Sequence, residues 1–415
     1  MNKVFEYKET RGLGGGHALI ALFQILALAI VFLFNISELN MESLFFALGL
    51  IVFTGLSSYL VRVFRMGDPY FLPIVNMIFS IGIIMIYRIN PALGQRQMFI
   101  YLISVTAFFL TYIFLKYTHE FWEGKIVFFF LATLSLFLVT LFFGRTRNGA
   151  QNWISIAGIQ IQPSEFAKIP FAFFVASWFK NYEYYNTTIL KKLSLTLATF
   201  VLIGLFFMQK ELGTAAVFFA VLLILQIAYE KNKWIPFLNI IFACIGLILG
   251  YKLFGHVRVR FDIWLNPWKD ALNKGYQIIQ ASFGMAEGSF FGTGIGLGHP
   301  EKIPLGHSDF IFAAVVEEFG ALMGLCLIFL FIILLYRGFK AAMMQEKDFY
   351  SALSLCIVVI FAAQAFIMFA GTMQLIPLTG ITIPFLTYGG SSLLSSFLLL
   401  SVLQLSSQDF IGWRD

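Results

Sequence analysis

The sequence predicts an all-α integral membrane protein that crosses the bilayer many times. Hydrophobic residues make up 59% of the 415 residues, only 12% are charged, and the mean hydropathy is +0.84. Soluble domains carry about twice that fraction of charge. The apolar residues also gather in separate runs, each close to the roughly 20 residues that a spanning helix needs. Together these observations exclude a soluble multidomain protein and indicate one polytopic membrane domain.

Twelve apolar runs qualify as candidate spanning helices, and an even number places both termini on one side of the membrane. The sixth run is the least regular, because it is short and contains Lys168 and Pro170. In chain order the predicted spans are residues 18–34, 43–63, 70–87, 98–116, 125–143, 164–180, 193–208, 213–229, 235–254, 309–336, 351–371 and 386–407.

Basic residues predict which side each loop faces. With the N-terminus inside, 16 of the 28 Lys and Arg residues fall in cytoplasmic segments, which follows the positive-inside rule. This distribution predicts a multi-pass protein of a cytoplasmic membrane with both termini cytoplasmic. It also accounts for the net charge of +6 without a nucleic-acid partner. All three cysteines lie inside apolar runs, so no disulfide framework is expected.

Three segments on the predicted outer side differ from simple connections: residues 144–168, 255–308 and 372–392. The second is the longest segment without a span, and loops of that length in compact domains are usually functional. Their Gly, Pro, Ser and Thr residues predict broken backbone at membrane depth. Such backbone is tolerated only where protein buries it or where it lines a wet cavity.

Residues 292–312 combine closely spaced glycines with Glu301, His307 and Asp309, directly before an apolar run. An ionisable group at the mouth of a membrane helix is costly, which makes it a functional candidate. The competing interpretation is structural, because Asp309 is also a good N-cap for the helix that follows. The glycines match neither the dinucleotide nor the Walker pattern, so a nucleotide site is not expected.

Histidines and carboxylates in the long outer segment raise the question of a metal. The spacing of His256, His299 and His307 matches no zinc motif. A divalent cation, Mg²⁺ or Mn²⁺, shared between carboxylates and a diphosphate ligand fits the available oxygen ligands better.

Other charged residues near the predicted outer face each have an ordinary explanation. Arginines and an indole at an interface can snorkel or anchor a helix, and Glu165 and Lys168 can pair at i, i+3 on one helix face. Taken together, however, these side chains lie at one predicted face of the membrane, around a wet cavity. This arrangement suits a lipid-linked anionic substrate. The set comprises Arg88, Arg145, Arg147, Trp153, Glu165, Lys168 and Glu211, with Arg258, Arg260 and Lys302 in the long outer segment.

Six motifs stand out along the chain. They are GAQNWI (149–154), IQPSEFAK (161–168), ELGTA (211–215), GYQIIQA (275–281), HSDFIFA with EEFG (307–320) and TGITIPFLTYGGSSLL (379–394). These motifs occur in the order found in the SEDS family of shape, elongation, division and sporulation proteins, which includes RodA, FtsW and SpoVE. The chain resembles this family over roughly residues 70 to 407.

The resemblance implies three regions. SEDS proteins have ten spans, so residues 1–69 are expected to be a cytoplasmic tail followed by two additional transmembrane helices. Residues 70–407 are expected to form the glycosyltransferase membrane domain, and residues 408–415 a short cytoplasmic tail.

The resemblance also implies an activity and a partner. SEDS proteins polymerise peptidoglycan glycan strands from lipid II on the outer face of the membrane, together with a single-pass class B penicillin-binding transpeptidase. Asp309 matches the essential acidic residue of the family's H-T-D-F-I-F motif, and Glu301 matches the acidic position before it. Trp153 and Lys168 match their motif positions, and Arg88 resembles an arginine of the first outer loop.

Two positions depart from the family pattern. Lys210 stands where the family usually has Pro, and Asn152 replaces the Arg commonly found before the tryptophan. Both put in question the individual roles of residues in those motifs. The TGITIP string blends features of the RodA and FtsW branches, so the sequence does not separate elongation from division.

The expected reaction is attack by an acceptor hydroxyl on the donor's anomeric carbon, with undecaprenyl diphosphate leaving. Asp309 is the expected general base. Two other classes remain as alternatives: a flippase that transports lipid II, and a catalytically silent scaffold for the transpeptidase. Basic residues expected to hold diphosphate are Arg145, Arg147, Arg258, Arg260 and Lys302.

Overall fold

The computed structural model describes residues 13–34, 40–147, 150–156 and 159–408. Within these residues the chain is almost entirely helical, with one small sheet, as the sequence predicts. The long helices are α1 (Leu13–Phe34), α2 (Met41–Val63), α3 (Phe71–Ile89), α4 (Pro91–Trp122), α5 (Ile126–Phe143), α6 (Pro163–Lys180), α9 (Ser194–Gln209), α10 (Leu212–Tyr229), α11 (Trp234–Leu253), α14 (Ile311–Met344), α15 (Asp348–Thr372) and α16 (Gly390–Ser406).

Each of the twelve predicted spans coincides with one of these helices. Nine helices in the described part of the chain are long and apolar enough to cross a membrane. The other three are α6, which contains Glu165 and Lys168, and the shorter apolar helices α9 and α16. The chain is therefore a multi-pass membrane protein.

The predicted boundaries were too short for the two longest helices. α4 has 32 residues against the predicted 98–116, and α14 has 34 against the predicted 309–336. Hydropathy marks only the part of a helix that lies in lipid, whereas both helices continue into polar sequence.

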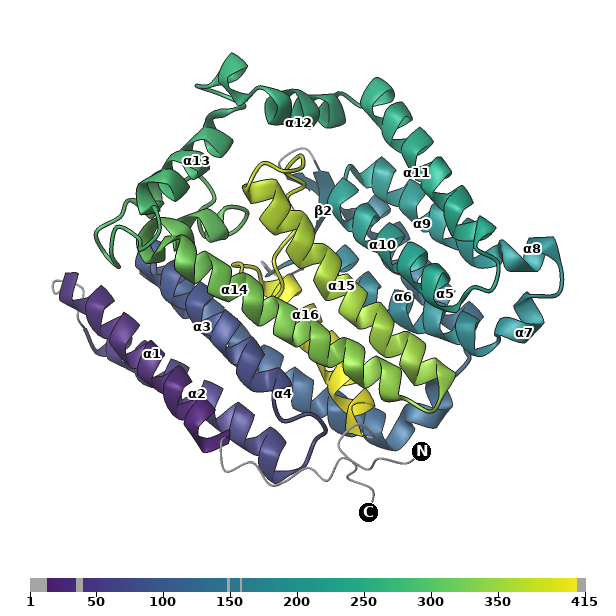
Figure 1. Ribbon diagram of the computed structural model, residues 1–415, viewed down its shortest axis with the longest axis horizontal. Helices are drawn as coiled ribbons and strands as arrows, with labels where there is room; N and C mark the ends of the chain where they lie inside the picture. Colours follow the sequence, from purple (N-terminus) through teal and green to yellow (C-terminus); the bar gives the residue numbers. More distant parts are fainter. Residues whose placement is uncertain (1–12, 35–39, 148–149, 157–158, 409–415) are drawn as a thin grey trace.

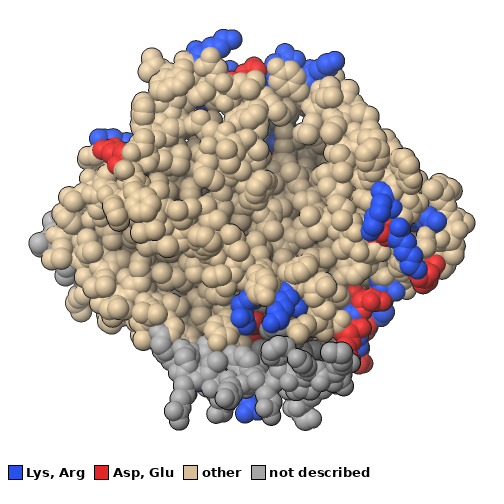
Figure 2. Space-filling view, viewed as in Figure 1, with Lys and Arg blue, Asp and Glu red and all other residues tan. Residues whose placement is uncertain are grey.

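The helices form a bundle whose centre is α3, α6, α15 and α16 (Figure 1). α3 and α15 are mostly buried, whereas in the apolar stretches of α1, α5 and α11 only 22% of the residues are buried. α1 and α2 lie at one edge of the bundle, and α11 lies at the opposite edge. On the face shown in Figure 2, charged side chains lie mainly along the edges and leave a broad uncharged area between them.

Buried polar side chains attach α1 and α2 to the rest of the bundle. The Gln24 amide of α1 donates hydrogen bonds to Thr54 Oγ1 of α2 at 3.0 Å and to Ser80 Oγ of α3 at 2.7 Å. The Asn76 amide of α3 donates to the Thr54 carbonyl at 2.9 Å. In lipid, packing and such hydrogen bonds drive helix association, so these contacts fix the position of α1.

At the end of the bundle where α2 meets α3, a buried ion pair joins distant parts of the chain. Arg337 Nη2 of α14 lies 2.6 Å from Asp68 Oδ2, and Asp68 is fully buried. The Gln404 amide of α16 donates to the carbonyls of Met66 and Asp68. The α2–α3 turn is thereby fixed against both α14 and α16.

The three predicted outer segments contain more regular structure than their composition indicates. Residues 145–147, 150–156 and 159–161 form an antiparallel sheet in the order β1-β2-β3, and 255–308 includes two α-helices and two short 3-10 helices. Residues 373–389 contain no helix or strand. The elements are β1 (Arg145–Arg147), β2 (Ala150–Ile156), β3 (Ile159–Ile161), α12 (Gly255–Leu265), η2 (Pro267–Asp270), α13 (Tyr276–Gly288) and η3 (Pro300–Lys302); the short helices α7 (Tyr182–Tyr185) and α8 (Ile189–Lys192) precede α9.

Figure 1 shows α12 and α13 above the bundle, at the same end as β2. The space-filling view is hollowed below α12, and basic atoms are visible inside the hollow (Figure 2).

Candidate functional site

Two irregular segments, residues 289–310 and 373–389, meet beside Asp309. The Tyr388 N–H donates to the His307 carbonyl at 3.0 Å, and the two rings pack edge to face. Gly380 has a φ of +72°, and a Cβ there would lie 3.6 Å from Asp309 Oδ2 and 3.8 Å from Arg260 Nη2. The Asp309 carboxylate and the Arg260 guanidinium therefore flank one glycine.

α12 positions the arginine. Arg260 Nη1 donates to the Thr379 carbonyl at 2.5 Å and to the Leu378 carbonyl at 3.3 Å. One turn further on, Trp264 Nε1 donates to the Gln374 carbonyl at 2.8 Å. These bonds satisfy carbonyls of the irregular segment 373–389 and bring the guanidinium next to Asp309.

The environment of Asp309 favours its protonated form. Burial raises the pKa of Asp309 to about 6, and the positive charge of Arg260 partly opposes this rise. Within the described part of the chain, no hydrogen bond or ion pair reaches the Asp309 carboxylate. The group combines raised basicity with unused lone pairs, as a general base requires.

The interpretation of Asp309 as a helix cap was wrong. Phe310 occupies the N-cap position of α14, and no side chain caps this helix. Backbone carbonyls supply the partners instead, since the Phe310 N–H donates to Leu305 O and the Ile311 N–H donates to Ser308 O. The carboxylate is therefore free of a capping role.

Glu301 lies in a different environment from Asp309. It is half exposed and accepts a contact of 3.0 Å from His299 Nδ1. Partial burial opposes its ionisation, but hydrogen bonds from its own backbone and from His299 together lower its pKa. Glu301 is therefore held as a carboxylate in a pH range where Asp309 begins to take up a proton.

Arg88 supports the acidic segment from α3. Its Nε lies 3.2 Å from Glu318 Oε1, and its Nη2 donates to the carbonyls of Gly296 and Gly298 at 3.4 and 3.3 Å. Glu318 is fully buried, so this ion pair neutralises a charge that would otherwise be costly. The structure thus places Arg88 in contact with the protein's own glycine stretch.

A buried ion pair lies in α6. Lys168 Nζ lies 2.7 Å from Glu165 Oε2, as the i, i+3 spacing predicted, and Ser395 Oγ of α16 donates to the same oxygen. Both members are almost inaccessible to solvent. Through Ser395, the Glu165 carboxylate of this pair is hydrogen-bonded to α16.

Glu211 is the centre of a second polar cluster. Its Oε1 accepts hydrogen bonds from Gln162, Ser164 and Thr214, while its buried Oε2 has no hydrogen-bond partner among the described residues. The next glycine, Gly213, packs directly against Thr379 and Ile381 of the segment 373–389. Glu211 therefore supports the same segment that carries Gly380.

The other predicted site residues are more dispersed. Arg258 is exposed and donates to the Lys252 carbonyl at 3.0 Å, and Lys302 is also exposed. Trp153 lies in β2, with its Cα paired to that of Arg145 in β1. The side chains of Arg145 and Arg147 and of His256 lie outside the described part of the structure.

Several contacts were missed because they involve uncharged residues. Gly380, Thr379, Gln162, Ser164 and Thr214 all occur inside the quoted motifs, but neither charge nor cost of burial distinguishes them in a sequence. Gln97 of α4, which donates to the Thr387 carbonyl and accepts from the Gly389 N–H, was not selected either.

The described residues contain no group of three or more His, Cys, Asp or Glu side chains that could hold a metal ion. The donor set therefore does not fit a metal site made of protein ligands alone. The divalent cation shared between carboxylates and a diphosphate stays a prediction.

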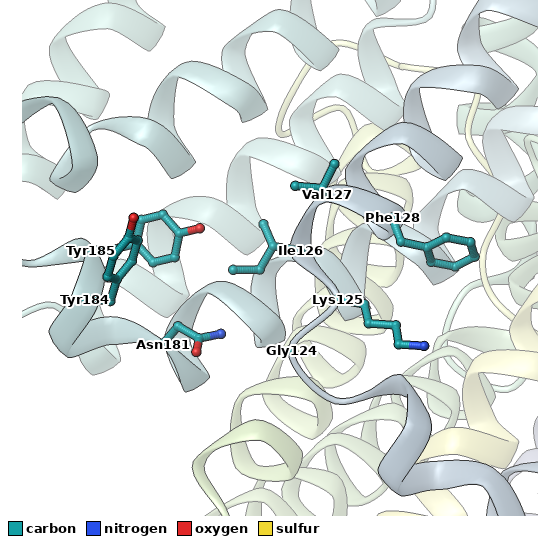
Figure 3. Close-up of a pocket in the computed structure, with 8 residues that line it drawn as sticks. All are labelled: Gly124, Lys125, Ile126, Val127, Phe128, Asn181, Tyr184 and Tyr185. Atoms are coloured by element: carbon teal, nitrogen blue, oxygen red, sulfur yellow. The ribbon is translucent and has the colours of Figure 1, made fainter.

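An open cavity of about 510 Å³ lies elsewhere, between the α4–α5 turn and α7 (Figure 3). Tyr184, Tyr185 and Asn181 lie on one side of it and Ile126 on the other, while Lys125 extends away. None of the elements that hold Asp309 lines this cavity, so it is separate from the candidate site.

Comparison with known proteins identifies the family. Residues 63–409 match the model of the cell cycle protein family that groups FtsW, RodA and SpoVE. The chain belongs to this family. The resemblance based on the six motifs is thereby confirmed, and the matched range begins at the last residue of α2.

Two relatives and one solved structure illustrate the similarity. The chain is 33% identical over 365 residues to peptidoglycan glycosyltransferase RodA of Mycobacterium tuberculosis (strain ATCC 25618 / H37Rv), covering 81% of this chain and 77% of the relative. It is 31% identical over 354 residues to stage V sporulation protein E of Bacillus subtilis (strain 168), covering 80% and 94%. A chain in the solved structure described as "Structural coordination of polymerization and crosslinking by a peptidoglycan synthase complex" has a TM-score of 0.69 and 24% identity, with 84% and 99% covered. The last similarity confirms the fold.

The raised pKa of Asp309 predicts a pH-dependent stability. Between the unfolded pKa of 3.8 and the folded value of about 6, only the unfolded chain releases this proton. The free energy of unfolding should therefore fall as pH rises through this window. In Asp309→Asn this contribution disappears, so the variant should gain unfolding temperature relative to wild type between pH 4 and pH 7. Asp262→Asn, an exposed change on α12, is the matched control and should show no such gain.

Proposed function

We propose that this chain is a peptidoglycan glycosyltransferase that polymerises lipid II into glycan strands. The observation that supports it most directly is Asp309, a partly buried carboxylate with a raised pKa and Arg260 beside it, at the end of a membrane helix. The relatives from Mycobacterium and Bacillus support the same conclusion, since the former carries this activity in its name.

The proposed reaction is an inverting transfer. The 4-hydroxyl oxygen of an acceptor sugar forms a bond to the anomeric carbon of the donor strand, while the bond from that carbon to undecaprenyl diphosphate breaks. Asp309 takes the hydroxyl proton, and the diphosphate leaves with the bonding electron pair. A pKa of about 6 suits this role, because the carboxylate is mostly ionised at neutral pH and still a useful base.

Basic side chains are proposed to stabilise the diphosphate. Arg260 is nearest to Asp309. Its Nη1 makes both hydrogen bonds to the carbonyls that hold the side chain, and its Nη2 makes neither of them. Arg258 of α12 and Lys302 of η3 are exposed and can bind the diphosphate headgroup of the approaching lipid. Arg145, Arg147, Trp153, Glu301 and the Glu165–Lys168 pair remain proposed binding residues, together with Arg88 and Glu211 as supports of the two irregular segments.

The flippase alternative requires ionisable residues near the middle of the bilayer that are accessible from both sides. In this structure Glu165 and Lys168 neutralise each other in a buried pair, and Asp309 lies outside α14. This arrangement favours an enzyme. The intact acidic segment likewise disfavours a silent scaffold.

Membrane orientation follows from the proposed reaction and the basic loops, with both termini cytoplasmic and α12 outside. A protein with Cys244, Cys326 and Cys356 replaced by serine allows single cysteines to be introduced at Asn273 and Glu183, both exposed. Asn273→Cys should react with an impermeant thiol reagent in whole cells, and Glu183→Cys only after lysis. The opposite labelling pattern would refute both the orientation and an outward-facing site.

A single-pass class B penicillin-binding transpeptidase is the proposed partner. The structural relative described as a peptidoglycan synthase complex couples polymerization with crosslinking, and this supports such a pairing. The proposed contact surface is the outer part of α15 and the segment after it, where Phe366, Met373 and Leu375 are exposed. Photo-crosslinkers at these positions should trap one single-pass partner in cells, whereas a crosslinker at Leu190 in α8 should not. Self-crosslinks alone would indicate a homo-oligomer that works without this partner.

Asp309→Asn provides the direct test of the activity. With purified protein and lipid II, the substitution should lower polymerisation by about 10²–10⁴-fold, the usual loss for a general base, while lipid II binding stays nearly unchanged. Glu301→Gln should have a smaller effect. An arm with EDTA, followed by Mg²⁺ or Mn²⁺, tests the proposed cation, and an arm with the transpeptidase tests the partner.

The activities of the two variants show which carboxylate, if either, is the base. If Asp309→Asn polymerises at the wild-type rate while Glu301→Gln is inactive, the base is Glu301. If both variants retain full activity, the acidic segment is not the catalytic centre.

A further inference from the structure

The outer end of α1 packs on the glycine stretch 292–298. Gly296 has a φ of +86°, and a Cβ at this position would lie 2.8 Å from Phe34 Cδ2 and 2.9 Å from Phe34 Cβ. The carbonyl of the same glycine accepts a hydrogen bond from Arg88 of α3. Gly296 is therefore held between two helices, one of which lies before the range matched by the family model.

The glycine stretch is also joined to the start of α14. The Thr293 N–H donates to Glu317 O at 2.9 Å, and the Gly294 N–H donates to Glu318 O at 3.1 Å. These bonds lie just before Gly320, where φ 87° and ψ 166° interrupt the helix. The first turns of α14 and the glycine stretch therefore form one unit.

α1 contacts this unit a second time. The Phe23 ring of α1 lies 6.4 Å from the Phe319 ring, measured between centroids, and Phe319 directly precedes the interruption at Gly320. The hydrogen bonds from Gln24 to Thr54 and Ser80 fix α1 in the bundle between its two contacts. The helix is thus a fixed support and not a loosely attached anchor.

The unit leads directly to the acidic residues. His299 follows the glycine stretch, and its N–H donates to Glu317 Oε1 at 2.6 Å. Glu301 accepts from the His299 ring, and the chain then turns through residues 303–306 to Asp309. A displacement of Gly296 would therefore also move Glu301 and Asp309, because a short run of chain and these hydrogen bonds connect them to the glycine stretch.

We infer that α1 is a positioning element for the reaction and that Phe34 is its main positioning residue. The inference rests on the proposed function. Phe34 does not touch the reacting atoms, but it holds the glycine stretch so that Asp309 stays in line with the acceptor hydroxyl. Misplacement of a reacting group by about 1 Å can cost about 10²-fold in rate.

The competing explanation is that α1 only adds lipid-facing surface. Phe34 is 51% exposed and its neighbour Leu33 is 67% exposed, so an anchoring role predicts similar effects for both side chains. Leu33→Ala is therefore the matched control for Phe34→Ala. Phe34→Leu keeps an apolar side chain on Gly296 and serves as the conservative variant.

Two measurements test the inference on full-length protein in detergent. In polymerisation of lipid II, Phe34→Ala should lower kcat by about tenfold or more with KM within about twofold, because alignment and not binding is lost. Phe34→Leu should recover most of the rate, and Leu33→Ala should match wild type. Hydrogen exchange should rise at residues 292–303 in Phe34→Ala, with no rise at residues 373–389.

The outcomes are distinguishable. Equal kcat and equal exchange in Phe34→Ala and Leu33→Ala would overturn the inference. So would a rise in exchange across the whole bundle with a fall in unfolding temperature, because that result indicates general destabilisation. If wild type itself makes no polymer, the proposed function fails, while hydrogen exchange still decides whether Phe34 supports the glycine stretch.

Discussion

Neutralisation of buried charge is the constraint on which the rest of this structure depends. Burying an unpaired charge costs several kcal/mol, whereas a well-made pair offsets most of that cost. Glu318 is paired with Arg88, Glu165 with Lys168, and Asp68 with Arg337. The Arg88–Glu318 pair joins α3 to α14, and the Asp68–Arg337 pair joins the α2–α3 turn to α14. The Glu165–Lys168 pair lies within α6, and Glu165 also accepts a hydrogen bond from Ser395 of α16. These pairs and the Ser395 hydrogen bond therefore help to fix α3, α6, α14 and α16 relative to one another.

Asp309 is treated differently from these carboxylates. Arg260 lies beside it but uses one nitrogen to satisfy the carbonyls of Leu378 and Thr379, and no ion pair within 4 Å forms between the two residues. The Arg260 side chain therefore has two functions. The backbone of 373–389 receives donors that irregular structure at membrane depth must have. Asp309 receives a positive charge strong enough to limit its pKa but too weak to hold the group ionised at low pH.

The sequence predicted the helices better than it predicted the site. Hydropathy located every long helix, because lipid imposes one length and one composition on each. Segment 255–308 was predicted to be functional, but the helices α12 and α13 within it were not predicted, since helices outside lipid lack that constraint. Arg258 and Arg260 were equivalent in sequence. The two arginines lie on different faces of α12. Arg260 points towards Thr379, whereas Arg258 is exposed beside the Tyr251 ring.

Asp309 and Glu301 show how one segment can hold two carboxylates with separate roles. Hydrogen bonds to Glu301 lower its pKa, while burial raises that of Asp309 to about 6, so the two pKa values are shifted in opposite directions. On the proposed mechanism, a diphosphate bound at Arg260 would compensate part of the positive charge that limits the pKa of Asp309. Binding of the donor would then raise the basicity of Asp309 at the moment when the acceptor hydroxyl must lose its proton. The same arginine would thereby couple diphosphate binding to the strength of the base.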